Sequence, residues 1–395
     1  MSSPDRSVLG IGMIGYAFMG AAHSHGWRDA GRVFDLPLDV RMAVLCGRNR
    51  EAAAAAAVRL GWESVETDWK AVVERDDVQL VDICTPGSSH GEIATAALTA
   101  GKHVLCEKPL ANTVAEARSM AEVARAARAS GVRSMVGFNY RRVPAVTFAR
   151  QLVAGGRVGE IRHVRAQYLQ DWIVDPEFPL VWRLKADEAG SGALGDIGAH
   201  IVDLTQYVTG QRITGVNAAL ETFVRERPLP GVSAGLSASG GSGEKGEVTV
   251  DDAALFLGRL GGGAVATYEA TRFATGRKNS IRVEVNGSAG SIAFDLERLN
   301  ELEFLDGTED AATQGFRRIL VTEPTHPYVA AWWPPGHTLG WAETFTHEMK
   351  DLVEAVGAGQ DPAPSFEDGL QVQLVLDAVQ RSAADRGCWT EVEAK

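Results

Sequence analysis

Residues 8–20 read VLGIGMIGYAFMG, and this stretch decides how the first third of the chain folds. The glycines that begin at Gly10 match a GxGxxG fingerprint letter for letter, but only two apolar residues precede Gly10, too few for a buried strand. The frame that begins at Gly15, with Ala17 in the second glycine position, follows seven residues of strand pattern and leads into a helix pattern. We therefore predict a strand that ends before Gly15 and a helix that begins near residue 18.

This second frame predicts a turn that binds a dinucleotide. Gly15 would form the tight turn, and the N-terminus of the following helix would direct backbone amides and its positive dipole end at a pyrophosphate. Ala17 replaces the glycine that normally lets the phosphate approach the backbone, and its methyl group weakens the match without removing it. The predicted contacts with the dinucleotide in this turn are Gly15, Ala17, Phe18 and Met19.

Short apolar runs alternate with helical stretches through the first 138 residues, a pattern typical of a parallel sheet covered by helices. Residues 113–116 (TVAE) form a capping box, which predicts the start of a long helix. We predict a doubly wound α/β Rossmann domain over residues 1–138, with strands at 8–14, 41–46, 78–84, 103–106 and 133–137.

The pattern changes after residue 138, where long strands follow one another with hairpin signals between them. Residues 227–246 are rich in Gly, Ser and Pro and predict a mobile loop. Residues 325–340 form a loop dense in aromatic side chains, which suits packing, a subunit contact or a wall of the substrate pocket. We predict one α+β domain over residues 139–395 with a large, mainly antiparallel open sheet, whose strands lie at 162–169, 216–225, 248–260, 264–271, 281–286 and 291–294.

The end of the second predicted strand bears on the choice of coenzyme. NAD sites usually place an acidic residue there for the ribose, whereas NADP sites favour an arginine. The strand ends in Cys-Gly-Arg-Asn, so Arg48 is suited to contact a 2′-phosphate, to stack on adenine or to face solvent. We predict NAD or NADP as the cofactor and favour NADP. We expect further coenzyme contacts after the third strand, from Thr85, Pro86 and His90, although His90 is equally suited to start its helix.

Two short stretches carry residues suited to chemistry: EKP at 107–109 and GSGALGDIGAHIVD at 190–203. Four residues separate Asp196 from His200, so a helix places both on one face. Oxidation of a secondary alcohol at a nicotinamide requires a base for the hydroxyl proton and a group that stabilises the oxyanion. His200 is the candidate base because its ordinary pKa is near about 6.5. Lys108 would supply the positive charge and lower the pKa of His200.

Each of these residues also has a purely structural explanation. A helix histidine is often a satisfied core residue, Asp196 suits the first turn of a helix, and Lys108 precedes a proline that holds it extended. Glu107 either contacts the nicotinamide ribose or caps the turn. Asp203 would complete a metal site with Asp196 and His200, but a carboxylate on a helix face explains that position more simply. We therefore predict no metal.

Four motifs together resemble the Gfo/Idh/MocA family of oxidoreductases. They are GYAFMGAAHS at 15–24, CTPGSSH at 84–90, CEKPLA at 106–111 and GSGALGDIGAH at 190–200. The resemblance covers nearly the whole chain and implies a two-domain fold, a nicotinamide coenzyme, and a homodimer or homotetramer formed through the C-terminal sheet. It also implies catalytic roles for Lys108, Asp196 and His200. The chain departs from the family pattern at Ala17 and in lacking an acid after the second strand.

The stretch 168–183 (YLQDWIVDPEFPLVWR) is further similar to the levoglucosan and glycoside 3-dehydrogenase branch of that family, to which inositol dehydrogenases are related. Its hydrogen-bonding groups and aromatic faces suit a polyol ring, although each also has a structural explanation. We expect the substrate pocket between the two domains, with contacts from Asn139, Tyr140, Gln170, Trp172, Arg183, Asp196 and His200.

Net charge and composition argue against some classes of binding partner. A net charge of -12 over 395 residues does not favour nucleic acid or an anionic membrane. No apolar run reaches the roughly 18 residues of a spanning helix, and the first residues lack a secretory pattern. The four cysteines show no CxxC spacing and suit buried thiols, as in cytoplasmic proteins. We expect a cytoplasmic protein whose partner is a small sugar or polyol.

These observations predict an NAD(P)-dependent dehydrogenase that oxidises a secondary ring hydroxyl of a sugar, anhydrosugar, glycoside or inositol to a ketone. One alternative is an NADPH-dependent reductase of keto-sugars in a biosynthetic pathway, which NADP preference would favour. An alternative of another class is a sensor that binds a dinucleotide without turnover. A sensor has no need of the complete set Lys108, Asp196 and His200, so the presence of all three argues against it.

Overall fold

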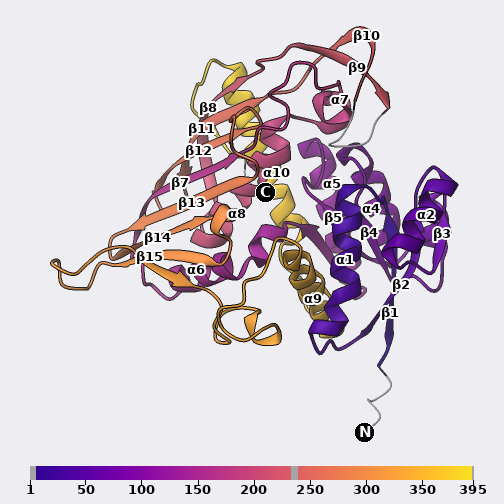
Figure 1. Cartoon of the computed structure of the whole chain (residues 1–395), viewed down its shortest axis with the longest axis horizontal. Helices are drawn as coiled ribbons and strands as arrows, with labels where there is room; N and C mark the ends of the chain where they lie inside the picture. The colour runs from indigo at the N-terminus through magenta and orange to yellow at the C-terminus, as the bar shows by residue number, and fades with distance from the viewer. Residues whose placement is uncertain (1–5, 233–238, 394–395) are drawn as a thin grey trace. The chain divides into compact units, whose positions relative to one another are not determined.

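The structure is a computed structural model that describes residues 6–232 and 239–393 (Figure 1). The chain divides into two compact units: Met1–Asn139 with Gly340–Leu370, and Tyr140–Leu339 with Gln371–Lys395. The boundary after Asn139 lies one residue from the domain boundary expected after residue 138. Residues 340–370, which the sequence pattern assigns to the second domain, belong instead to the first unit.

The first unit is built on a six-stranded parallel sheet with the strand order β3-β2-β1-β4-β5-β6. This is the doubly wound order, in which the direction of winding reverses between β1 and β4. The prediction of a Rossmann-type parallel sheet is therefore confirmed. Its strands are β1 (Val8–Ile14), β2 (Asp39–Cys46), β3 (Ser64–Glu66), β4 (Leu80–Ile83), β5 (His103–Glu107) and β6 (Ser134–Gly137).

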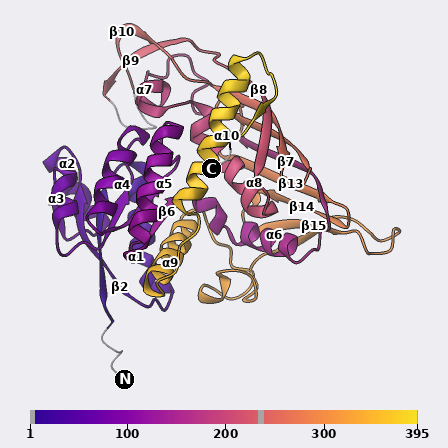
Figure 2. The same ribbon diagram turned by 180° about the vertical axis from the view of Figure 1, so that it is seen from behind.

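Helices cover this sheet because each presents an apolar stripe to it. The helix α9 shows why residues 340–370 join the first unit: Met349, Leu352 and Val353 are completely buried in one cluster with Trp27 of α1. Figure 1 shows α9 beside α1, and Figure 2 shows α4 beside α5. The helices are α1 (Phe18–Val33), α2 (Arg50–Leu60), α3 (Trp69–Glu74), α4 (His90–Thr99), α5 (Val114–Arg128) and α9 (Glu343–Gly357).

Side-chain caps begin two of these helices. Thr113 and Glu116 form the predicted capping box at the start of α5. Asn49, directly after Arg48, accepts a hydrogen bond from the Ala52 amide and caps α2. The chain therefore turns sharply from the end of β2 into α2, which leaves Arg48 exposed at the carboxyl edge of the sheet.

The second unit contains a nine-stranded sheet with the order β16-β15-β14-β13-β7-β12-β11-β8-β17. Among its neighbouring pairs only β12 and β7 run parallel, in the part of the chain that the structure describes. The prediction of a mainly antiparallel sheet is confirmed. Its strands are β7 (Ile161–Leu169), β8 (Ile213–Glu221), β11 (Ala253–Leu260), β12 (Val265–Thr271), β13 (Ser280–Gly287), β14 (Gly290–Asp295), β15 (Glu301–Asp306), β16 (Arg317–Leu320) and β17 (Thr390–Glu391).

Side chains alternate between buried and exposed along these strands, as a sheet with one covered face requires. Helices α6 and α8 lie against the covered face (Figure 2). The helices of this unit are α6 (Pro144–Ala154), α7 (Ala186–Ala189), α8 (Ala199–Thr209) and the larger part of α10 (Phe366–Ala384).

The expectation of a mobile loop over residues 227–246 is wrong for the residues that the structure describes. They form an antiparallel pair of strands, β9 (Glu226–Val232) and β10 (Ser239–Glu247), while residues 233–238 lie outside the described part. Arg227 anchors the pair because its buried guanidinium donates hydrogen bonds to the carbonyl oxygens of Ile173 and Asp175 at 2.6 and 2.8 Å. The Gly- and Ser-rich composition of this stretch gives no indication of the long-range hydrogen bonds that Arg227 makes.

Candidate active site

The turn after β1 has the geometry that the second glycine frame requires. Gly15 has φ +99°, and its N–H donates to the Cys46 carbonyl oxygen at 3.0 Å. A Cβ atom at Gly15 would lie 2.7 Å from the Cys84 carbonyl oxygen, and one at Gly20 would lie 2.1 Å from the Gly15 carbonyl oxygen. Only glycine fits both places. Ala17 is the N-cap residue of α1, so the free amides of the first helical turn lie where Phe18 and Met19 were expected to face a pyrophosphate.

The earlier glycines lie inside β1 and serve packing. A Cβ atom at Gly10 would lie 2.0 Å from the Asp77 carbonyl oxygen, and one at Gly12 would lie 2.5 Å from a methyl group of Val72. The letter-for-letter GxGxxG match is therefore misleading, as the sequence argument held. The turn itself fits a dinucleotide, because the backbone approaches closely and the helix N-terminus follows at once.

At the end of β2 an aromatic ring covers the backbone. A Cβ atom at Gly47 would lie 1.9 Å from the ring of Tyr16, so this ring lies directly on Gly47. The next residue, Arg48, is exposed and lies beside this covered backbone.

The loop after β4 carries the expected coenzyme residues Thr85 and Pro86. The Thr85 hydroxyl accepts a hydrogen bond from Ser89, and Pro86 precedes the turn that leads into α4. His90 begins α4 and is buried, with one ring nitrogen 2.8 Å from the Thr85 carbonyl oxygen and the other 3.1 Å from that of Pro109. This placement supports the loop rather than presenting the ring to a ligand.

The EKP stretch lies at the carboxyl end of β5, the edge at which doubly wound sheets bind ligands. Lys108 is half-buried, and its peptide bond to Pro109 is cis. Glu107 is almost completely buried, and one of its carboxylate oxygens accepts the Lys108 N–H at 3.0 Å. Its other oxygen lies 2.9 Å from Nε2 of His23.

In the second unit, Asp196 and His200 follow one another on a helix that begins with a wide turn. Residues Leu194–Gly198 form a π-helix, which passes directly into α8. Single π turns occur frequently at functional sites because they redirect side chains. The Asp196 side chain is 27% exposed, whereas His200 is buried. The expected helix is present, but its first turn is not a regular α-helix.

Asp203 is paired with a buried arginine. Its carboxylate accepts two hydrogen bonds from Arg141, from Nε at 2.8 Å and from Nη2 at 2.5 Å, and both side chains are buried. Such a fork-to-carboxylate pair occupies both oxygens of Asp203. The carboxylate therefore anchors α8 to the segment that begins the second unit.

A polar and aromatic network surrounds His200. Its ring lies 4.8 Å from that of Tyr140 and 5.8 Å from that of Tyr168, centroid to centroid. The two tyrosine hydroxyls are 3.0 Å apart, and Tyr168 donates to the Asn279 side chain at 2.6 Å. Burial raises the pKa of Tyr168 far above its ordinary value, and the neighbouring Tyr140 and the charge of Asp196 act in the same direction. Tyr168 therefore remains a neutral phenol.

The same network extends to two predicted substrate residues. The Gln170 amide donates to Asn279 at 2.9 Å, and the Trp172 indole N–H donates to Gln170 at 3.0 Å. A buried arginine, Arg272, lies between this network and Asp196: its Nη1 is 3.6 Å from an Asp196 oxygen, and its guanidinium lies over the Trp172 ring. The structure thus brings together Tyr140, Gln170, Trp172, Asp196 and His200.

Contacts of their own are seen for the other two predicted substrate residues, Asn139 and Arg183. Asn139 belongs to the first unit, where it is buried and donates to the Thr344 hydroxyl at 2.9 Å. Arg183 stacks on its neighbour Trp182, with 4.3 Å between the guanidinium carbon and the ring centroid.

Sequence reasoning missed four polar residues that the structure places at these sites. Asp82 had a visible signal, because a charged residue inside the apolar run of β4 requires a buried partner. No sequence signal marked His23, Asn279 and Arg272, because their partners lie far away in the sequence.

Comparison with known proteins agrees with this architecture. Residues 9–138 match the family described as "Oxidoreductase family, NAD-binding Rossmann fold", and residues 146–293 match the "GFO/IDH/MocA C-terminal domain". Levoglucosan dehydrogenase of Pseudarthrobacter phenanthrenivorans is 44% identical and aligns over 97% of this chain and 98% of its own length. Inositol 2-dehydrogenase of Rhizobium meliloti is 26% identical over 88% of this chain and 91% of its own.

Solved structures agree as well. An oxidoreductase domain protein from Kribbella flavida is 65% identical, with a TM-score of 0.94 over 98% of this chain and 100% of its own. A levoglucosan dehydrogenase in complex with NADH and levoglucosan is 41% identical, with a TM-score of 0.91 over the same shares of the two chains. The fold and the two sites define an oxidoreductase with an NAD-binding Rossmann unit. The chain belongs to the Gfo/Idh/MocA family.

None of the helices in the described ranges combines the length and the apolar character that crossing a bilayer requires.

Proposed function

We propose that this protein is an NAD-dependent dehydrogenase that oxidises a secondary ring hydroxyl of a neutral sugar or anhydrosugar to a ketone, with levoglucosan as the first compound to test. The observation that carries the proposal is the uncharged network of Tyr140, Tyr168, Asn279 and Gln170 beside His200. Its hydroxyl and amide groups match the alternating donors and acceptors of a polyol ring. Relatives named for levoglucosan, inositol and glucose 6-phosphate act on ring compounds of this kind.

The residues in this network favour a neutral ring over a phosphorylated one. Arg272, whose Nη1 lies 3.6 Å from an Asp196 oxygen, is completely buried. Its Nη2 donates to the Asp251 carbonyl oxygen at 3.1 Å, and its charge lies beside Asp196. A phosphate group needs accessible cationic donors, and this network of tyrosine, asparagine, glutamine and tryptophan side chains offers only uncharged ones.

In the proposed reaction the alcohol carbon loses a hydride and the alcohol oxygen loses a proton. His200 takes the proton, Lys108 stabilises the negative charge that develops on the oxygen, and Asp196 orients the imidazole or a substrate hydroxyl. The bound nicotinamide ring supplies the hydride acceptor. Lys108 belongs to the first unit and the other two residues to the second, so the proposal requires all three to act on one substrate.

The turn from Gly15 to Met19 would hold the coenzyme pyrophosphate, with Thr85, Pro86, Glu107 and Lys108 as further contacts. Structures of levoglucosan dehydrogenase contain NADH, and we propose NAD for this chain. The NADP preference suggested by Arg48 stays a prediction. In this proposal Arg48 contacts the 2′-phosphate of NADP, and the Arg48→Ala substitution would remove that contact.

The test is a screen of levoglucosan, inositols and simple glycosides against NAD⁺ and NADP⁺, read by the absorbance of the reduced coenzyme. Lys108→Ala and His200→Ala should each abolish turnover while coenzyme affinity, measured by fluorescence titration, stays within about threefold. Loss of coenzyme binding instead would assign these residues another role. A protein that binds NADH with normal affinity but turns over none of these compounds would favour the sensor alternative.

We also propose that the open face of the nine-stranded sheet binds a second copy of the chain. Leu255, Leu257 and Val265 point out of neighbouring strands and are 49%, 52% and 43% exposed. Apolar side chains grouped on one sheet face are typical of a subunit contact. Light scattering at several protein concentrations measures the resulting dimer or tetramer.

A further inference from the structure

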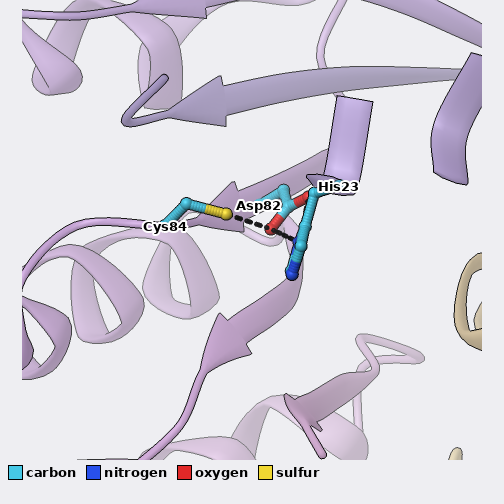
Figure 3. A group of neighbouring side chains, drawn as sticks. All are labelled: His23, Asp82 and Cys84. Carbon is cyan, nitrogen blue, oxygen red and sulfur yellow. Dashed lines mark hydrogen bonds and ion pairs between the residues drawn. The ribbon is translucent and has the colours of Figure 1, made fainter. Parts of the chain in front are cut away.

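A buried ion network lies beneath the Glu107–Lys108 segment, and no role assigned above uses it. His23 of α1 lies between two carboxylates, Asp82 of β4 and Glu107 of β5. Its Nδ1 is 3.0 Å from both oxygens of Asp82, and its Nε2 is 2.9 Å from an oxygen of Glu107. The exposed fractions of the His23, Asp82 and Glu107 side chains are 0%, 0% and 6%. Figure 3 shows the ring of His23 directed at Asp82.

The geometry determines the charge of the ring. A neutral imidazole has one N–H, so one of the two carboxylates would face a lone pair. Two short contacts to ionised oxygens require two N–H donors, and therefore an imidazolium. Burial acts to lower the pKa of His23, but the charge of Asp82 and the hydrogen bonds with Asp82 and Cys84 outweigh it, and the pKa is raised well above its ordinary value.

Neighbouring side chains from α1, from Cys84 directly after β4 and from α9 support the arrangement. Trp27, one turn further along α1, donates its indole N–H to Asp82 at 2.7 Å, and the Cys84 thiol lies 3.6 Å from the other Asp82 oxygen. From α9, the uncharged ring of Phe345 lies 5.3 Å from that of His23. Asp82 is thus held in place, and it holds the imidazolium in turn.

The network ends at the backbone of Lys108. The Glu107 oxygen that does not face His23 accepts the Lys108 N–H at 3.0 Å. A continuous chain of contacts therefore runs from Asp82 through His23 and Glu107 to the main chain that carries the lysine side chain.

We propose that His23 is a positioning residue of the dehydrogenase: its imidazolium orients the Glu107 carboxylate, and through it Lys108, and its charge sets the proton affinity of the site. This inference rests on the proposed function, because it gives Lys108 a part in the reaction. In the intact network one positive and two negative charges leave a net charge of -1. Removing the imidazolium would leave -2 beside Lys108 and make the neighbouring groups hold their protons more tightly.

The first measurement does not depend on activity. Nuclear magnetic resonance of the ¹⁵N-labelled histidine rings in the full-length protein reports the protonation of each ring nitrogen. We expect His23 to carry both protons at pH values above the ordinary histidine pKa of about 6.5. In Asp82→Asn the pKa of His23 should fall toward that ordinary value. A neutral His23 ring at pH 7 in the wild type would overturn the proposal.

The second measurement is the pH profile of kcat in His23→Asn, with coenzyme affinity measured alongside. We expect kcat to fall ten- to about a hundredfold, as displaced catalytic groups cause, with coenzyme affinity within about threefold. By Coulomb's law, a unit charge displaces a pKa by about one unit at a separation of roughly 10 Å and an effective dielectric of about 20. The kcat profile should therefore move to higher pH by about one unit, because the base and the lysine both hold their protons more tightly.

Two variants separate charge from support of the turn. His90 is a second buried histidine that contacts the same turn, through the Pro109 carbonyl oxygen, and burial lowers its pKa. His90→Gln changes the support of that turn while Asp82, His23 and Glu107 stay in place, and its kcat profile should keep its position on the pH axis. His23→Asn combined with Glu107→Gln restores the net charge of the network to -1 and should return the profile toward that of the wild type.

Three further results would overturn the proposal. They are an unmoved pH profile in a folded His23→Asn protein, an equal displacement in His90→Gln, and a stoichiometric metal ion in the purified wild type. The third counts because the ligand atoms of His23, Asp82 and Cys84 lie within 4.8 Å of one another, and a metal on Nδ1 would exclude the proton placed there. Full turnover in Lys108→Ala would instead refute the proposed function, while the protonation of His23 would stand.

Discussion

The buried pair of Arg141 and Asp203 should stabilise the second unit, so removing one partner should lower the free energy of unfolding. Arg141 donates two hydrogen bonds to Asp203, and the exposed fractions of the two side chains are 9% and 2%. Asp203→Ala would leave the guanidinium buried opposite a cavity. Removing one partner of such a pair costs about 3–5 kcal/mol, because the remaining charge has lost its compensation.

A cation–π contact should offset part of that cost, since the guanidinium of Arg141 also lies 5.0 Å from the Tyr207 ring centroid. A cation over an aromatic face contributes about 0.5–2 kcal/mol. We therefore expect the free energy of unfolding to fall by about 3 kcal/mol, at the lower end of the range. Replacing both partners together, as Arg141→Met with Asp203→Leu, should recover most of the loss because both members of the pair are removed.

The assay is urea unfolding followed by circular dichroism, with kcat measured on the same samples. A pair with an exposed cation provides the control: Lys278, whose side chain is 82% exposed, lies 2.8 Å from Asp171, whose side chain is 9% exposed. Lys278→Met should cost less than about 1 kcal/mol. Because Asp203 lies on α8 with His200, Asp203→Ala should also reduce kcat. A loss no greater than that of the Lys278 control, or recovery of activity on adding a divalent metal, would refute this reasoning.

Three further predictions concern the coenzyme and the assembly. Gly15→Ala should weaken NAD binding by more than about tenfold, because the position has φ +99° and backbone atoms within 3 Å, whereas Gly12→Ala should affect stability alone; isothermal titration of both variants measures the contrast. Arg48→Ala should weaken NADP binding more than NAD binding, and equal effects in the same titration would remove the 2′-phosphate role. Leu257→Glu should shift light scattering toward the monomer, since it places a charge on the open sheet face, and an unchanged mass would exclude that face as the contact.

Local sequence features predicted much of the first unit. The apolar run before Gly15, the turn itself and the capping box at Thr113 each involve residues close in the chain, and the structure shows all three. The short strand β3 and the helix α3 were missed, because three and six residues are too few for a clear hydrophobic period.

Long-range polar contacts could not be predicted in the same way. His23 meets Asp82 and Glu107 across 59 and 84 residues, and neither spacing leaves a mark in the sequence. The π-helix before α8 was missed as well, because an Asp–His spacing of four also fits an ordinary helix. The burial of Arg227, which orders β9, is likewise set by carbonyl oxygens of a distant segment.

The central claim is that Lys108 and His200 act on the same alcohol in one chemical step. A double-mutant cycle of Lys108→Met and His200→Gln tests it directly, with kcat/KM for levoglucosan oxidation as the measured quantity. If both residues serve one step, the double variant should be little worse than the poorer single variant. Losses that multiply, as they do for independent sites, would contradict the account.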